Sequence, residues 1–316
     1  MAIKLGIVIP CYNEEQVIPE TAQRVREVLG RLIVANKISE VSTVYFVDDG
    51  STDRTWRRIV DLANQSREVS GIKLARNRGH QNALLAGLFT ADGEALISMD
   101  ADLQDDINVI EEMVDRHHQG VDIVYGVRKR RASDTRVKRL SAQVFYRMMA
   151  FMGAETIHDH ADFRLMSRRA IDALKQFREV NLFLRGIVPL IGYRSAVAYY
   201  DRGERFAGES KYPLRKMVAF AVDGITSFSI VPLRCITLIG FVFFLTALAL
   251  SGWALWIRLF TDRAVPGWTS IAVPTFFLGG VQILCIGVIG EYLGKIYVET
   301  KGRPRYIIET IVGPTS

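Results

Sequence analysis

The sequence has few cysteines and lacks the glycine-rich motifs of the commonest nucleotide-binding folds. Its 316 residues include three cysteines, Cys11, Cys235 and Cys285, whose spacing forms no pair. We interpret them as reduced thiols, which excludes a disulfide-stabilised secreted scaffold. Neither G-x-G-x-x-G nor G-x-x-x-x-G-K-[ST] occurs, so a dinucleotide-binding fold and a P-loop have no motif support. The short β-type run after Lys4 does not resemble a signal peptide.

Charged residues are absent from two long stretches in the last third of the chain. Residues 235–257 and 264–290 contain no Asp, Glu, Lys or Arg over 23 and 27 positions. A helix of ~20 apolar residues crosses ~30 Å of hydrocarbon. Because a buried core helix seldom lacks charge over its whole surface, we expect two transmembrane helices. The lack of ionisable residues inside them also disfavours a channel or transporter subunit.

The charges that flank these stretches predict their orientation. Cations gather on the side of the N-terminal part and after the second stretch, at Arg215, Lys216, Arg234, Lys295, Lys301, Arg303 and Arg305. The connecting hairpin carries only Arg258, Asp262 and Arg263. By the positive-inside rule we expect a multi-pass protein of the inner (cytoplasmic) membrane, with both termini in the cytoplasm. The net charge of +6 fits contact with an anionic leaflet and, beside two spans, does not indicate a nucleic-acid partner.

Short apolar runs alternate with amphipathic helical patterns through the first 125 residues. The expected strands are 5–10, 44–47, 71–75, 95–99 and 121–125, and the expected helices include 18–32, 56–63, 81–90 and 106–119. This alternation predicts an α/β domain with a mostly parallel sheet covered on both faces. Ligands bind beyond the carboxyl ends of such strands. Polar clusters follow Pro10, Val47, Ala75 and Met99, so we expect them to converge on one site.

An acidic motif follows the fourth expected strand. Asp100, Asp102 and Gln104 are spaced two residues apart, and in an extended segment such residues project to the same side. Oxygen ligands of this kind suit Mg²⁺ or Mn²⁺, which commonly bind substrate phosphates as well. A solvated turn produces the same pattern by chance. The interpretation of this motif as a metal site therefore depends on the other polar clusters that we expect at the same sheet edge.

Two basic segments follow this region. Residues 128–139 hold seven cations beside a single acidic residue, and residues 202–212 combine glycines and cations with a hydroxyl. The neutral interpretations are a solvated face and a flexible loop. The functional interpretations are a loop that collects an anionic head group at a membrane surface and a clamp for phosphate. The moderately apolar stretch 214–231 predicts a helix that lies in the membrane interface.

Five motifs occur in order along the chain. They are Ile9–Glu15 (IPCYNEE), Val47–Asp53 (VDDGSTD), Asp100–Gln104 (DADLQ), Asp162–Arg164 (DFR) and Gly208–Tyr212 (GESKY). Together they resemble the polyprenyl-phosphate branch of family 2 glycosyltransferases, whose members include dolichol-phosphate mannose synthase and the bactoprenol glucosyltransferases. The resemblance covers residues 3–212 by motif and the two apolar stretches by architecture. Processive polysaccharide synthases share the first motifs but carry Q-x-x-R-W and more spans, and this chain has neither.

The resemblance implies a GT-A fold, which is Rossmann-like, followed by an interfacial helix and two transmembrane helices. The expected bounds are 1–213 for a cytoplasmic glycosyltransferase domain, 214–233 for a juxtamembrane amphipathic helix, 234–296 for two transmembrane helices with a short external hairpin, and 297–316 for a cytoplasmic tail.

The resemblance also implies roles for individual residues. Nucleotide binding falls to Pro10, Tyr12, Glu14, Asp48, Asp49 and Asp100, and binding of the metal and the diphosphate falls to Asp100, Asp102 and Gln104. Asp162 and Asp102 are the expected catalytic residues, and Arg128, Arg131, Arg205, Ser210 and Lys211 are expected to bind the acceptor phosphate. A phosphate monoester is largely dianionic at neutral pH. We therefore expect Asp162 mainly to orient the acceptor or to take a residual proton.

The expected reaction is inverting transfer of a monosaccharide from a nucleotide sugar, with UDP-glucose as the first choice, to undecaprenyl or another polyprenyl phosphate on the cytoplasmic leaflet. The product would serve modification of cell-envelope glycans such as O-antigen. The alternatives are UDP-N-acetylglucosamine, GDP-mannose or UDP-aminoarabinose as donor, or an inactive membrane-anchored scaffold that partners a flippase or a second transferase. Gly279, Gly280, Gly287 and Gly290 favour close helix packing and hence a homo-oligomer through the transmembrane helices.

Overall fold

The computed structural model describes residues 2–128, 160–179, 184–201 and 268–313, with scattered residues between 233 and 260. The chain divides into two compact units. The first comprises Met1–Tyr146, Glu155–Tyr212 and Arg303–Ser316, and the second comprises Arg147–Ala154 and Pro213–Gly302. The C-terminal residues therefore belong to the same unit as the N-terminal α/β region.

The described part of the first unit is built on an eight-stranded sheet, with the strand order β7-β5-β6-β4-β1-β2-β3-β8. The strands are β1 (Leu5–Cys11), β2 (Thr43–Asp48), β3 (Val69–Leu74), β4 (Ala95–Ser98), β5 (Ile123–Arg128), β6 (His160–Ser167), β7 (Ser195–Tyr200) and β8 (Ile308–Val312). Four of the seven strand pairs are parallel. The predicted mostly parallel sheet is confirmed.

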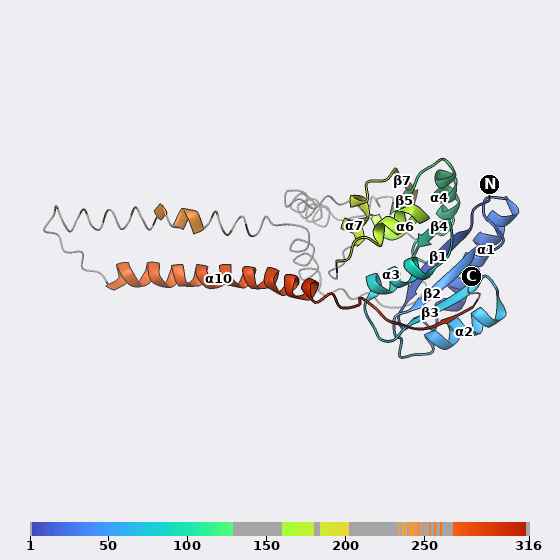
Figure 1. Ribbon diagram of the computed structural model, residues 1–316, viewed down its shortest axis with the longest axis horizontal. Helices are drawn as coiled ribbons and strands as arrows, with labels where there is room; N and C mark the ends of the chain where they lie inside the picture. The colour runs from blue at the N-terminus through green and yellow to red at the C-terminus, as the bar shows by residue number, and fades with distance from the viewer. Residues whose placement is uncertain are drawn as a thin grey trace. The chain divides into compact units, whose positions relative to one another are not determined.

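Helices cover both faces of this sheet (Figure 1). They are α1 (Ile18–Val34), α2 (Thr55–Gln65), α3 (His80–Thr90), α4 (Val109–His118), α6 (Arg168–Leu174) and α7 (Leu184–Leu190). The buried side chains of α1 and α4 share one core cluster with alternate residues of β1, such as Ile7 and Ile9. The residue between them, Val8, meets α3 at Gly87, where an added Cβ would lie 2.2 Å from Val8 Cγ1. Alternate side chains of β1 thus pack on opposite faces of the sheet, against α1 and α4 on one face and against α3 on the other.

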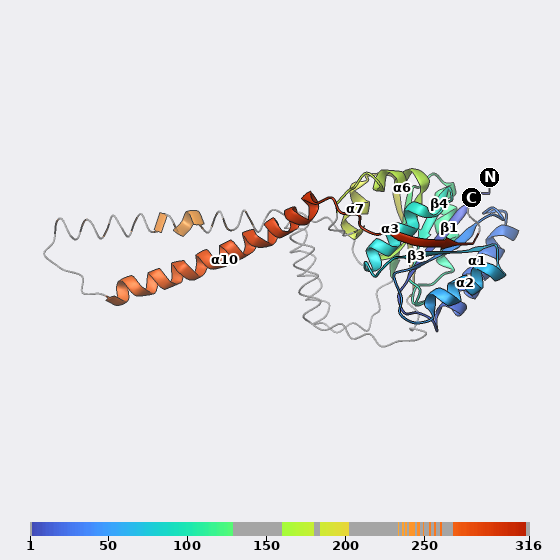
Figure 2. The same cartoon turned by 60° about the horizontal axis from the view of Figure 1, so that its bottom comes forward.

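The edge strand β8 is one that the sequence analysis did not predict. It pairs antiparallel with β3, with Ile72 opposite Ile311, and both views show it running along β3 (Figure 1 and Figure 2). The connection that leads into it is also fixed, because Ala75 N–H donates to the Ile307 carbonyl at 2.9 Å and the Arg305 guanidinium donates to the Phe177 carbonyl. β8 covers the backbone groups of β3 that would otherwise form an open sheet edge.

The second unit contains α10 (Trp268–Thr300), a helix of 33 residues. Its stretch Phe277–Thr300 is long and apolar enough to cross a membrane, and its most apolar window has no part buried inside the protein. Within the described residues it is one candidate span. The expected span 235–257 is described only at scattered positions, and the expected interfacial helix 214–231 lies outside the described residues. Two transmembrane helices therefore stay a prediction.

Candidate active site

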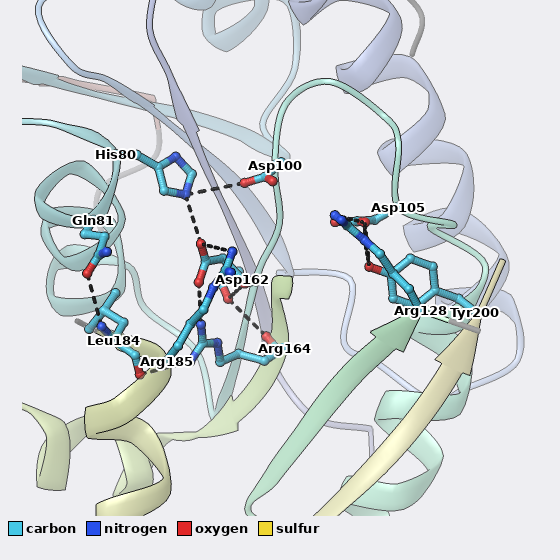
Figure 3. A network of polar contacts seen from close by, with 11 residues as sticks. His80, Gln81, Asp100, Asp105, Arg128, Asp162, Arg164, Leu184, Arg185 and Tyr200 are labelled. Carbon is cyan, nitrogen blue, oxygen red and sulfur yellow. Dashed lines mark hydrogen bonds and ion pairs between the residues drawn. The ribbon is translucent and has the colours of Figure 1, made fainter. Parts of the chain in front are cut away.

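Antiparallel pairing of β4 with β6 brings two acidic segments together. Ser98, the last residue of β4, lies opposite Arg164, and the Ser98 hydroxyl donates to the Asp162 carbonyl at 2.5 Å. Asp100 follows Ser98 by two residues, and Asp162 precedes Arg164 by two. Both carboxylates therefore emerge at the carboxyl end of β4, where the sequence predicted a ligand site (Figure 3).

His80 joins these two carboxylates. Its Nε2 lies 3.4 Å from Asp100 Oδ1 and 3.7 Å from Asp162 Oδ2. Sequence reasoning missed this residue, because a single histidine after a strand belongs to none of the five motifs. The backbone that carries it is fixed by Asp49, whose carboxylate accepts from Arg78 N–H at 2.7 Å and Gly79 N–H at 2.8 Å. The φ of +87° at Gly79 makes a glycine suitable at the turn into α3.

Asp162 is an ionised carboxylate held by arginines. Arg164 Nη2 lies 2.7 Å from Oδ1 and Arg185 Nη2 lies 3.5 Å from Oδ2. Burial raises the pKa of Asp162, but the charges of Arg164, Arg185 and His80 more than offset this and lower the pKa to about 2. A carboxylate with so low a pKa binds a proton weakly. This favours an orienting role over a role as a strong base.

Asp100 has the opposite electrostatic setting. Burial is the main cause that raises its pKa to about 6, and the charges of Asp162, Asp105 and Asp102 raise it further, against the opposing effect of His80. Asp100 Oδ1 accepts no hydrogen bond from the described residues. Its near polar neighbour is His80 Nε2 at 3.4 Å, and a carboxylate oxygen that accepts no hydrogen bond is the kind of ligand that a divalent cation takes up. The described residues contain no group of three or more His, Cys, Asp and Glu side chains arranged to hold a metal ion, so a metal bound by Asp100 and Asp102 stays a prediction.

The acidic motif is not extended as the sequence analysis expected. Residues 101–103 form a turn, and Leu103 has a φ of +55° in the left-handed region. The turn is stabilised by Gln104 N–H, which donates to Asp102 Oδ1 at 3.2 Å. The premise that Asp100, Asp102 and Gln104 share one side of a strand is therefore wrong. Their assignment as metal ligands stays a prediction that rests on the oxygen chemistry and the sheet edge.

The expected nucleotide residues lie at the carboxyl ends of β1 and β2. Pro10 is opposite Val47 in the parallel register, and Asp48 lies beside Cys11. Asp48 is fully buried, and burial is the main cause that raises the pKa of its carboxyl. Its Oδ1 accepts from Ser51 N–H at 3.2 Å, whereas Oδ2 has no donor among the described residues. Because Oδ2 is itself buried, a nucleoside does not reach it in this structure, and the nucleotide-binding role of Asp48 stays a prediction.

Tyr12 and Glu14 follow β1 in the same region. Tyr12 is 46% exposed. Glu14 N–H donates to Thr55 Oγ1 at 2.8 Å, which ties this loop to the start of α2. The nucleotide-binding roles of these residues, and of Asp49 beside its structural role, stay predictions.

Of the expected acceptor-phosphate residues, the structure describes Arg128. It ends β5 and contacts Asp105 and Tyr200 rather than the Asp100–Asp162 cluster (Figure 3). Arg131, Arg205, Ser210 and Lys211 lie outside the described residues. A cavity of about 840 Å³ lies beside this region and includes Gln104 and Asp105, but its lining does not include His80, Asp100 or Asp162. The cavity therefore does not mark the acidic cluster, and we place the candidate site by side-chain chemistry.

A mostly parallel α/β sheet with a carboxylate pair beyond its strand ends has the Rossmann-like architecture of the GT-A fold, in which ligands bind at that edge. The chain belongs to glycosyl transferase family 2, whose family model matches residues 6–175. It is therefore a glycosyltransferase enzyme.

Three relatives cover nearly the whole chain. An uncharacterized glycosyltransferase of Bacillus subtilis, YkoT, is 51% identical over 96% of this chain and 91% of its own length. The prophage bactoprenol glucosyl transferase homolog of Escherichia coli is 40% identical over 98% of this chain and 99% of its own. The bactoprenol glucosyl transferase of Shigella phage SfV is 40% identical over 97% and 98%. The chain is thus similar along its length to glycosyltransferases, two of which carry the name bactoprenol glucosyl transferase.

Proposed function

We propose that this enzyme transfers glucose from UDP-glucose to a polyprenyl phosphate at the cytoplasmic leaflet of the inner membrane, with inversion at the anomeric carbon. The observation that carries the proposal is the combination of a family 2 catalytic sheet with α10 in one chain. Seven residues, 301–307, separate the end of α10 from β8 in the catalytic sheet. A helix that is long and apolar enough to cross a membrane is thus joined to a strand of the catalytic sheet by a short segment of the chain.

The physical reason for such an anchor is the acceptor. Each CH₂ group of a polyprenyl chain costs about 0.8 kcal/mol to expose to water. The lipid therefore stays in the bilayer, and the enzyme has to reach its phosphate at the membrane surface. Among the described residues, no atom lies within 4 Å of a Cβ added at Gly287, Gly290 or Gly294, and small residues of this kind favour close approach of a second helix or a second copy of the chain.

The reaction forms one bond and breaks one bond. An oxygen of the acceptor phosphate attacks the anomeric carbon, and the bond from that carbon to the β-phosphate oxygen of UDP breaks, with its electron pair leaving on UDP. Asp162 is ionised at neutral pH, and we propose that it orients the acceptor together with Arg185, which is 41% exposed. Asp100 and Asp102 would hold Mg²⁺ or Mn²⁺. When bound, such an ion neutralises charge on the leaving diphosphate.

The experiment is an incubation of membranes that contain the protein with undecaprenyl phosphate and a panel of labelled nucleotide sugars. We expect label from UDP-glucose in the lipid extract and much less of it with Asp162→Asn. The Asp122→Asn variant is the matched control, since Asp122 is an ion-paired carboxylate remote from the acidic cluster, and it should retain transfer. Label from another donor alone would contradict UDP-glucose as substrate, and label confined to water-soluble products would contradict the lipid acceptor.

A further inference from the structure

A second polar cluster lies beside the acidic cluster and consists of Asp105, Arg128 and Tyr200 (Figure 3). Asp105 Oδ1 accepts from the Tyr200 hydroxyl at 2.5 Å and from Arg128 Nη2 at 3.1 Å. Arg128 Nε donates to the Tyr200 oxygen at 3.1 Å. Each of the three residues therefore contacts the other two.

This cluster is well buried. The Asp105 side chain is 3% exposed and Tyr200 is 1% exposed, whereas the Arg128 side chain is 31% exposed. Burial and the neighbouring Asp105 raise the pKa of Tyr200, so its hydroxyl remains a donor. Asp105 Oδ1 accepts from both neighbours, whereas Oδ2 has no hydrogen-bond partner among the described residues. Hydrogen bonds inside a buried network are strong because the local dielectric is low. The cluster therefore holds the Nε–Nη2 edge of the Arg128 guanidinium from the protein side.

The three residues adjoin three segments of the chain for which the sequence analysis predicted functions. Asp105 follows the acidic motif directly. Arg128 is the last residue of β5 and opens the basic segment 128–139, and Tyr200 is the last residue of β7, just before the segment 202–212. Arg128 and Tyr200 also lie opposite each other in the parallel register of β5 and β7. The Tyr200 ring packs edge-on against Phe163, which follows Asp162, at 5.6 Å between ring centroids.

The third nitrogen of the Arg128 guanidinium, Nη1, has a different environment from the other two. Nε and Nη2 of Arg128 are occupied by Asp105 and Tyr200, while the part of the chain that the structure describes offers Nη1 no acceptor. An arginine with a fixed plane and an unpaired N–H is suited to a phosphate oxygen, because a charge-assisted hydrogen bond is strong and directional.

We propose that Asp105 and Tyr200 are positioning residues that hold the Arg128 guanidinium so that its Nη1 edge binds the phosphate of the lipid acceptor. This inference rests on the proposed function, from which it takes the phosphate monoester acceptor. It assigns roles to two residues outside the predicted site, and it separates recognition of the acceptor from the carboxylates that serve the donor.

Two variants test the inference in the full-length protein, each with a matched control. Tyr200→Phe removes one hydroxyl, and its control is Tyr45→Phe, because Tyr45 is also buried and its hydroxyl accepts from Asp92 N–H at 3.2 Å in a different part of the fold. Asp105→Asn is matched by Asp122→Asn, a buried carboxylate paired with Arg169 just before β5. The readout is KM for undecaprenyl phosphate and for UDP-glucose.

We expect Tyr200→Phe and Asp105→Asn to raise KM for the lipid phosphate about tenfold and to leave KM for UDP-glucose within about twofold, as for the loss of one charge-assisted hydrogen bond. The two controls should change neither constant. Equal changes for both substrates, no change, or the same change in a control would overturn the inference.

A double-mutant cycle separates positioning from a general loss of structure. If Tyr200 acts through Arg128, then Tyr200→Phe added to Arg128→Ala should raise KM for the lipid phosphate no further than Arg128→Ala alone. Additive effects would show that Tyr200 acts by another route and would overturn the inference.

Binding of farnesyl phosphate, a short polyprenyl monophosphate, distinguishes this inference from the proposed function. If the wild type binds farnesyl phosphate but transfers no sugar to a lipid phosphate, the proposed function fails, and a tenfold weaker affinity in Tyr200→Phe still supports positioning. Unchanged affinity in Tyr200→Phe overturns positioning alone. No binding by the wild type overturns both.

Discussion

Asp162 Oδ1 lies 2.7 Å from Arg164 Nη2, two residues further along β6, and the two side chains are only 14% and 2% exposed. Ser98 and Asp100 come from one segment of the chain, and Asp162 with its two arginines comes from another, with 64 positions between Ser98 and Asp162. An arginine cannot lose its proton under ordinary conditions. Asp162 is therefore the counter-charge of a buried cation as well as a candidate catalytic group, and its substitution should have two separable effects.

The first prediction concerns stability. Asp162→Asn leaves Arg164 charged and buried without its main partner, so the free energy of unfolding should fall by about 3–5 kcal/mol. Chemical denaturation of the purified protein measures this loss. Asp162→Asn combined with Arg164→Met removes the stranded charge and should restore part of the stability. A double variant that is less stable than the single one would contradict the ion-pair explanation.

The second prediction concerns the pH dependence of catalysis. The pKa of Asp162 is lowered to about 2, so this carboxyl stays ionised across the range in which the enzyme is assayed. At saturating divalent cation, the acid limb of kcat/KM should follow the second pKa of the acceptor phosphate, near ~6. Asp162→Asn should lower the rate but keep this limb. A limb that disappears in the variant would mean that Asp162 itself titrates.

The third prediction uses Asp122, at the opposite end of β5 from Arg128. Hydrogen bonds from Arg169 and then Ser167 lower its pKa. The stabilisation is present above the pKa of an unfolded aspartate, ~3.9, and is lost as the pH falls through the lower folded value. Asp122→Asn should therefore lower the melting temperature at pH 7, and the gap from wild type should narrow below about pH 4. A gap that widens in acid would contradict this assignment.

The fourth prediction tests the close packing that supports α3, the helix that starts at His80. Gly87→Ala would place a Cβ 2.2 Å from Val8 Cγ1 and 2.7 Å from Val47 Cγ2, so overpacking should destabilise the protein by about 1–3 kcal/mol. Gly30→Ala is the control. A Cβ at Gly30 in α1 meets nothing within 4 Å, and alanine there should stabilise by up to about 1 kcal/mol. Similar effects of the two substitutions would contradict the packing argument.

The sequence predicted the first half of the fold well because local patterns determine it. Apolar runs ending at Pro10, Val47 and Met99 identified three parallel strands and the edge at which their ligands gather. The strands β6, β7 and β8 were missed. The pairing of β6 with β4 joins residues more than 60 positions apart, and β8 returns to β3 from the far end of the chain. Neither contact leaves a local periodicity in the sequence.

The sequence predicted which residue types form the candidate site, but it did not predict the contacts between them. The motifs identified Asp100 and Asp162, whereas their proximity follows from the β4–β6 register and their opposite pKa shifts follow from Arg164, Arg185 and burial. His80 has no motif, so only the folded chain reveals it. The turn at Leu103 was missed because a positive φ at a leucine has no sequence signal.

The most direct test of the central claim is transfer of labelled glucose by purified full-length protein from UDP-glucose to undecaprenyl phosphate, with and without Mg²⁺ or Mn²⁺. We expect one glucose per lipid phosphate, inverted at the anomeric carbon and formed only when the metal is present. Asp102→Ala should be inactive while it remains folded and bound to membranes. Transfer that needs no metal, or Asp102→Ala with wild-type activity, would contradict the account.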